Sequence, residues 1–138
     1  MAHVTHFNQR FISALDLGLS DVTLAAERTS NAVNTAGYSQ LTIFVNFSTR
    51  SAADNIKVEI DEDFDEAAAN YAAYLSQTAA TAAGVVTLSD AVYTKAVTAA
   101  KKFHINVPIN CKQFKLRLSA LNGAAGDICS VNLLLGTN

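Results

Sequence analysis

A run of acidic residues is the densest group of potential ligands in the chain. Asp61, Asp63 and Asp65 have the alternate spacing with which a calcium-binding loop begins. That loop requires glycine at its sixth position and glutamate at its twelfth, where this chain has Glu66 and Ala72. The run therefore favours a solvated turn, with a weak calcium site as the alternative. Glycosidases also use a pair of carboxylates, but consecutive acids without an aromatic cleft give little support for glycoside hydrolysis.

The histidines and cysteines form no recognisable catalytic or metal-binding motif. His3 and His6 lie near the N-terminus, and His104 is expected on the solvent side of a strand. Cys111 is near His104 in the sequence, but a proline separates them, and two cysteines are too few for a four-cysteine zinc site. Nucleotide-binding and nucleophile-elbow motifs are absent. We therefore predict no catalytic residue, no metal site, no cofactor and no enzymatic activity.

The two cysteines are expected to be free thiols. Segments 113–119 and 127–135 could form a hairpin around 122–126. In that register Cys129 lies opposite about residue 118 and Cys111 opposite about residue 136. Their Cα atoms would then be farther apart than the roughly 7 Å that a disulfide allows. Reduced thiols also agree with a chain that is made in the cytoplasm.

The segment 38–48 supplies the strand around which the fold is expected to form. Apolar side chains occupy every second position, and alternate residues of a strand face opposite sides of the sheet. β-branched and aromatic residues suit such a half-buried surface. One face would hold Leu41, Ile43, Val45 and Phe47, and the other Thr42, Phe44, Asn46 and Ser48.

Further short segments alternate in the same way and are separated by turn residues. No strand–helix–strand rhythm is present, so a parallel sheet is not expected. Seven or eight such strands predict an all-β fold, a single antiparallel β-sandwich with jelly-roll or immunoglobulin-like topology. The other predicted strands are 20–28, 55–61, 85–88, 91–96, 102–108, 113–119 and 127–135.

An N-terminal arm, 1–18, precedes the predicted sandwich domain, 19–138. Phe7, Phe11, Ile12 and Leu15 recur at near-helical spacing, which predicts a short helix, or else an extended arm lying on a neighbouring subunit. Packing on its own domain is the alternative. We predict that Phe7, Phe11 and Ile12 contact a partner.

An alanine-rich insertion, 62–84, interrupts the strand pattern. Alanine is the best helix former, and Tyr71, Tyr74 and Leu75 share one helical face, so the pattern predicts a helix over 65–77 or an irregular connection. Long connections in compact domains commonly contact partners. Tyr71 and Tyr74 are therefore further candidate contact residues, or the platform of a carbohydrate-binding module.

Composition excludes several functional classes. The chain has 138 residues, a net charge of −2 and no basic stripe, so no nucleic-acid partner is expected. No signal peptide and no apolar run of the roughly 20 residues that a membrane helix needs are evident. The chain is expected to remain in the cytoplasm unless it leaves by lysis or within a particle.

The order of segments resembles small β-sandwich proteins of tailed-bacteriophage virions, most of all capsid decoration (cement) proteins. The resemblance spans about residues 20–136. It is carried by NTAGYSQLTIFVNFS (34–48), GVVTLSDAVYTKAV (84–97), KFHINVP (102–108) and QFKLRLSALNGAAGDICSVNLLLG (113–136).

The resemblance implies a virion structural protein that binds and stabilises the major capsid protein lattice. It implies a homo-oligomer, with a trimer favoured, and a location in the virion after synthesis in the host cytoplasm. It transfers no catalytic residue. A neck or tail component and a carbohydrate- or cell-surface-binding sandwich are the alternatives.

Overall fold

A computed structural model of the chain describes residues 9–35, 37–49, 54–63, 72–73, 75–77, 88–90, 92–97, 101–120 and 126–137. The described part is almost entirely β-structure with one short helix. Its elements are β1 (Gln9–Ile12), α1 (Ala14–Leu17), β2 (Val22–Thr23), β3 (Arg28–Thr29), β4 (Val33–Asn34), β5 (Gln40–Thr49), β6 (Asp54–Asp63), β7 (Ala72–Ala73), β8 (Leu75–Gln77), β9 (Leu88–Asp90), β10 (Val92–Val97), β11 (Lys101–Pro108), β12 (Gln113–Ala120) and β13 (Ile128–Gly136).

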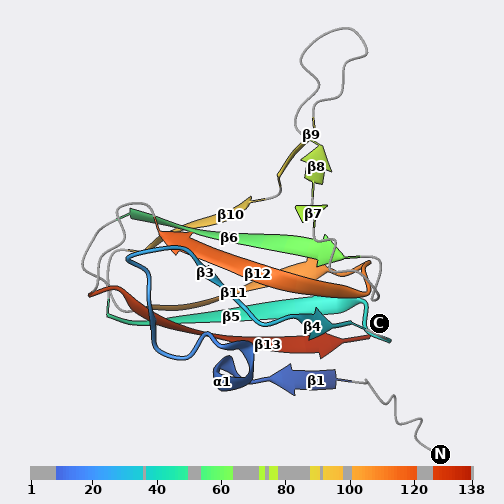
Figure 1. The fold of residues 1–138 in the computed structure, drawn as a ribbon, viewed down its shortest axis with the longest axis horizontal. Coiled ribbons are helices and arrows are strands. Elements are labelled where there is room, and N and C mark those ends of the chain that lie inside the picture. Colours follow the sequence, from blue (N-terminus) through green and yellow to red (C-terminus); the bar gives the residue numbers. More distant parts are fainter. Residues whose placement is uncertain are drawn as a thin grey trace, which may run out of the picture.

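Two antiparallel sheets pack face to face, as the sequence predicted for an all-β sandwich (Figure 1). Sheet A has the order β1-β13-β5-β11, and β2 also pairs with β13. Sheet B has the order β10-β6-β12-β3, with β4 on β12 and β7 on β6. Neighbours in each sheet are mostly far apart in the sequence, so the fold depends on long-range pairing.

The core lies between the sheets and follows the predicted alternation. Leu41, Ile43, Val45 and Phe47 of β5 are all buried, whereas Phe44 on the opposite face is exposed. β12 and β13 alternate in the same way. Their inward residues include Phe114, Leu116, Leu118, Cys129, Val131, Leu133 and Leu135.

The prediction of a hairpin between the last two strands is wrong. β12 belongs to sheet B and pairs with β6, β3 and β4, whereas β13 belongs to sheet A and pairs with β5, β1 and β2. Each of these strands has one strongly apolar face. Because the strands lie in different sheets, the two apolar faces are buried toward each other in the core between the sheets. Cys111 and Cys129 are free thiols, as predicted.

The N-terminal helix expected around Phe7–Leu15 is not formed in the described part of the arm. Residues Gln9–Ile12 form strand β1, which pairs with β13 and places Ile12 opposite Leu133. The helix α1 begins only after Ser13, whose Oγ accepts a hydrogen bond from the Asp16 amide at 3.2 Å. It ends at Gly18, whose φ of 72° is a left-handed conformation that suits glycine.

The strand expected over 20–28 is also shorter than its pattern indicated. β2 covers only Val22–Thr23, and the chain resumes pairing at β3, so Ala26 lies exposed instead of inside. Alanine and short polar residues bury too little apolar surface in this segment to hold a long strand on the core.

The prediction of a helix over 65–77 is wrong where the structure describes that segment. β7 pairs with β6, and β8 pairs with β9 in a separate ribbon that projects from the sandwich (Figure 1). Helix propensity is a weak preference that strand pairing overrides here. The remainder of the predicted helix, with Asp65, Tyr71 and Tyr74, lies outside the described residues.

Candidate functional site

The outer face of sheet A is the candidate site because it is nearly free of charge. This face consists of the side chains that alternate with the buried ones on its strands. Among those in the described part of the chain, Lys102 is the only Lys, Arg, Asp or Glu. The face includes Phe11, Thr42, Phe44, Asn46, Ser48, Lys102, His104, Asn106, Ile128, Ser130, Asn132 and Leu134.

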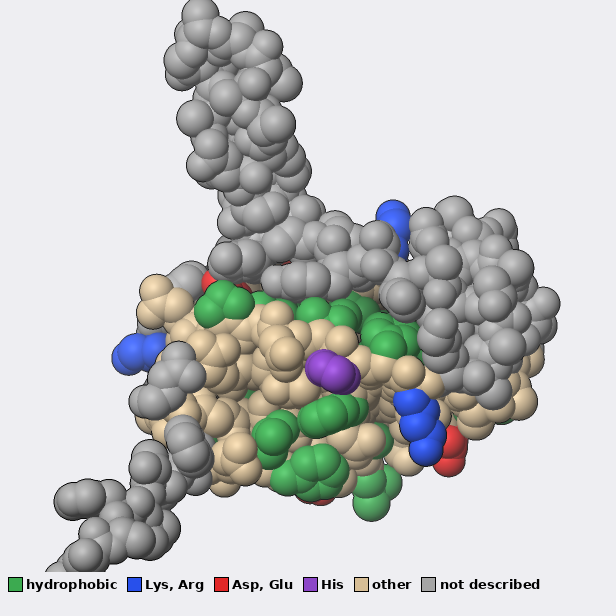
Figure 2. Space-filling view, turned by 180° about the vertical axis from the view of Figure 1, so that it is seen from behind, with side chains coloured by type: hydrophobic (Ala, Val, Ile, Leu, Met, Phe, Trp, Pro, Cys, Tyr) green, Lys and Arg blue, Asp and Glu red, His purple; other side chains and the backbone are tan. Residues whose placement is uncertain are grey.

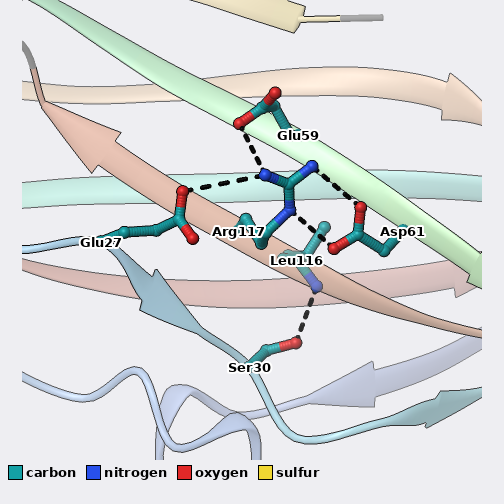
Figure 3. A network of polar contacts seen from close by, with 6 residues as sticks. All are labelled: Glu27, Ser30, Glu59, Asp61, Leu116 and Arg117. Atoms are coloured by element: carbon teal, nitrogen blue, oxygen red, sulfur yellow. Dashed lines mark hydrogen bonds and ion pairs between the residues drawn. The ribbon is translucent and has the colours of Figure 1, made fainter. Parts of the chain in front are cut away.

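The outer face of sheet B is different, since it carries charged residues that are engaged in ion pairs. Arg117 of β12 donates two hydrogen bonds to Asp61 of β6, at 2.6 and 2.9 Å (Figure 3). Its guanidinium also lies 3.3 Å from Glu59 and 3.8 Å from Glu27. The hydrogen bonds to Asp61 raise the pKa of Arg117, with further contributions from the nearby carboxylates. This face holds its strands together with its own charges.

The two described aspartates of the acidic run both have partners within sheet B. Asp61 is bound to Arg117, and Asp63 is fully buried and accepts a hydrogen bond from Gln113 Nε2 at 2.9 Å. Asp65 lies outside the described residues. Within the described ranges, no group of three or more His, Cys, Asp or Glu residues is placed to hold a metal ion.

Glu62 and Cys111 meet at one end of the core. Glu62 follows Ile60 on the inward face of β6, opposite Phe114, and is 8 % exposed. Burial raises the pKa of Glu62, and a hydrogen bond from the Cys111 thiol partly opposes this effect. Burial, followed by the Glu62 charge, raises the pKa of Cys111 to about 12. That shift is opposite to the activation that a nucleophilic cysteine requires.

A shallow hollow lies on the outer face of sheet A, where three strands run side by side. Phe44 of β5 is paired with Asn132 of β13 on one side and with His104 of β11 on the other. In the adjacent row, Asn46 lies between Ser130 and Lys102. An open depression of about 320 Å³ lies beside the two rings, lined also by Asn46, Lys102 and Asn132.

The rim of the hollow is held in place by defined contacts. Phe44 and His104 have ring centroids 6.0 Å apart and planes inclined by 46°. The Oδ1 atom of Asn132 accepts a hydrogen bond from the Ala14 amide at 2.8 Å, which fixes the side-chain amide against the start of α1. Figure 2 shows this face, with a histidine beside a group of hydrophobic side chains.

An apolar corner adjoins the hollow at the N-terminal edge of sheet A. Phe11, predicted as a contact residue, is 62 % exposed beside Leu134, and Leu15 of α1 is 79 % exposed. Ile12, predicted in the same role, is 7 % exposed and belongs to the core, so its side chain does not face a partner. Phe7, Tyr71 and Tyr74, the other predicted contacts, lie outside the described residues.

Sequence reasoning did not identify the hollow, although its components were visible. Phe44 and Asn46 occupy the polar side of the central strand, and Asn132 lies on the mixed side of the last strand. What the sequence did not provide was the pairing of β13 and β11 on either side of β5, which brings these residues together with Lys102 and His104.

Comparisons with known proteins support the fold and leave the site unassigned. No protein-family model matches the chain, and no curated protein matches it. Among solved structures, the SPBc2 prophage-derived protein YomS is similar over 99 % of this chain and 100 % of that one, with a TM-score of 0.51 and 10 % sequence identity. Dimeric latent PorU from Porphyromonas gingivalis gives a TM-score of 0.44 at 10 % identity, over 98 % of this chain and 13 % of that one. The first likeness shows a shared fold, and the second carries no structural argument.

Proposed function

We propose that this chain is a structural subunit of a tailed-phage virion and that its specific role is capsid decoration. The observation that carries the proposal is the contrast between the two outer faces. In sheet B, Arg117 is paired with neighbouring carboxylates, whereas sheet A presents exposed apolar and neutral polar side chains. Depletion of charge and enrichment of aromatic residues are typical of the centre of a protein interface.

The strand order supports this proposal because it fits a jelly roll. When β3 and β4 are counted as one strand and the short β2, β7, β8 and β9 are set aside, eight strands remain. The first pairs with the eighth, the second with the seventh, the third with the sixth and the fourth with the fifth. This is the pairing of one long hairpin wrapped into two sheets. Jelly rolls occur in viral capsid and lectin domains.

The full-length likeness to a prophage-derived protein agrees with a phage origin. No helix in the described part of the chain is long and apolar enough to cross a membrane. A decoration protein needs only modest affinity per copy, because many copies bind one lattice and oligomers bind through several contacts at once. In this proposal Phe11 and Leu15 contact the major capsid protein or a neighbouring subunit.

The proposal is tested by the mass of the purified protein and by its binding to bare phage heads. Light scattering on a sizing column should give a trimer of three 14.6 kDa chains, and sedimentation with heads should be saturable. A hexamer or larger ring that binds no heads would replace decoration with a neck or tail role. A monomer that binds neither heads nor other virion parts would contradict the whole proposal.

Phe11→Asp tests the proposed contact residue. Since Phe11 is largely exposed, the variant should keep its circular dichroism spectrum and its thermal midpoint within a few degrees, yet sediment with heads much more weakly. Ser119→Asp introduces the same charge on the outer face of sheet B, opposite Lys57, and serves as the control. Equal binding by Phe11→Asp and the unmodified protein would exclude Phe11 from the contact.

A further inference from the structure

We propose that the hollow on sheet A is a saccharide-binding site in which one sugar ring packs against Phe44. In this site Asn46 and Asn132 hydrogen-bond the hydroxyl groups, and Lys102 gives acidic sugars an advantage over neutral ones. The site is distinct from the virion contact at Phe11 and does not depend on it.

The shape of the hollow suits a flat ligand that remains partly in water. It is open on one side, and its volume of about 320 Å³ can hold one or two sugar rings. Phe44 is 39 % exposed and lies against the tilted ring of His104. A pyranose has an apolar face of C–H groups that packs on an aromatic ring, while its hydroxyl groups point sideways. An enclosed apolar ligand would instead need a cavity that buries most of its surface.

The polar side chains around Phe44 provide hydrogen-bonding groups for a sugar ring that packs on Phe44. The Oδ1 atom of Asn132 is occupied by the Ala14 amide, so the Nδ2 group remains as a donor on the side of the hollow. The side-chain amide of Asn46, in the adjacent row, has no hydrogen bond to the described residues and offers both a donor and an acceptor. Hydroxyl groups require such mixed partners, and amide side chains supply them.

The charge of the hollow distinguishes between classes of ligand. Lys102 is exposed, is the only charged residue among the described residues that line the hollow, and has no salt bridge to them or to the rest of the described chain. None of those lining residues is an acid, and Asp21, which accepts a hydrogen bond from Ser130 Oγ at 3.2 Å, is not one of them, so an acidic group on the sugar meets Lys102 within the hollow itself. Phosphate-rich ligands are usually held by several cations or by arginine forks, and the hollow has neither. A sugar that carries one carboxylate, such as a uronic acid, fits this arrangement best.

The experiment is a titration followed by ¹⁵N–¹H NMR, with methyl galacturonide, which carries one carboxylate, and the neutral methyl galactoside as probes. The amides of Phe44, Asn46 and His104 should shift in a saturable way with both probes, and the acidic probe should bind several-fold more tightly. Phe44→Ala should weaken the binding of both probes about tenfold, a change that corresponds to roughly 1.4 kcal/mol. Lys102→Gln should remove the advantage of the acidic probe only.

Matched controls lie on the same protein but outside the hollow. Phe11→Ala removes a more exposed aromatic ring from the same sheet face, and Asn106→Ala removes an amide that is bonded to Thr42 at 2.9 Å. Lys112→Gln removes an exposed lysine elsewhere. None of these three should change the affinity for either probe.

Two results would overturn the proposal. One is the absence of saturable shifts with either probe at tens of millimolar, and the other is unchanged affinity in Phe44→Ala. If Phe44→Ala lost binding to phage heads and neither saccharide shifted the amides of the unmodified protein, the hollow would be assigned to a protein contact instead. Because Phe11→Asp tests the virion contact and leaves the hollow intact, the two proposals can fail independently.

Discussion

At the scale of single residues, Glu62 is the clearest exception to the folding pattern. Ile56, Val58 and Ile60 occupy the inward positions of β6, and Glu62 takes the next one. Placing an ionisable group at a core position costs free energy when the group is charged. The raised pKa of Glu62 expresses this cost, because burial favours the neutral carboxyl. The Cys111 thiol and the buried Asp63 lie beside it, and neither supplies a positive charge.

Replacing Glu62 with Gln should therefore stabilise the protein increasingly as the pH rises. The folded-state pKa of Glu62 lies above the unfolded value of about 4.5, so its protonated form is favoured on folding. This stabilising contribution is complete below pH 4.5 and is lost as the pH passes through the folded-state pKa. Urea unfolding of both proteins from pH 4 to 8 should show curves that converge at low pH and separate above it. Asp16→Asn, at an exposed site, should not reproduce that separation.

At the scale of elements, the sequence predicted strands well and their partners poorly. The central strand, 55–61, 102–108, 113–119 and 127–135 all appear as strands within a few residues of the expected bounds. Each has several large apolar residues at alternate positions, and this local signal does not depend on the rest of the chain. Pairing depends on which sheet buries each face, so β12 and β13 were wrongly joined as a hairpin. The hollow required two pairings, those of β5 with β11 and with β13, and could not be predicted from local pattern.

The Arg117 network joins β12, β6 and the segment before β3, and its removal should weaken sheet B (Figure 3). In Arg117→Gln the carboxylates of Asp61 and Glu59 lose their common cation and repel each other across neighbouring positions. We expect a loss of about 2 kcal/mol in the free energy of unfolding, because two charge-assisted hydrogen bonds are lost. High salt screens the repulsion. The difference between variant and parent should therefore shrink in 1 M NaCl relative to 0.05 M.

Glu27→Gln is the control for the Arg117 network. Glu27 is half exposed and lies 3.8 Å from the guanidinium, so its replacement should cost less than about 1 kcal/mol. If Arg117→Gln were no less stable than Glu27→Gln, the network would be a surface arrangement without a role in holding β6 and β12 together. Guanidinium chloride is unsuitable for this comparison because it is itself a salt, so unfolding should be followed in urea.

At the scale of the whole molecule, the fold is closed by pairing between its two ends. β1 and β13 are the first and last strands described, and they lie side by side in sheet A. β13 also pairs with β5, so the last strand connects the N-terminal edge with the central strand. Pairing across such long sequence separations makes folding slow relative to helical proteins. It also means that the two sheets should separate only when the whole sandwich unfolds.

Cys129 offers a direct test of that cooperativity. Its side chain is fully buried on the inward face of β13, and burial, with a smaller contribution from Asp21, raises the pKa of its thiol to about 12. In a Cys111→Ser background, a thiol reagent at pH 8 should therefore modify Cys129 only when the sheets separate. The opening free energy derived from the labelling rate should fall with urea concentration with the same slope as the free energy of global unfolding. A rate that is fast and independent of urea would mean instead that β13 opens locally, and the sandwich would then not behave as one cooperative unit.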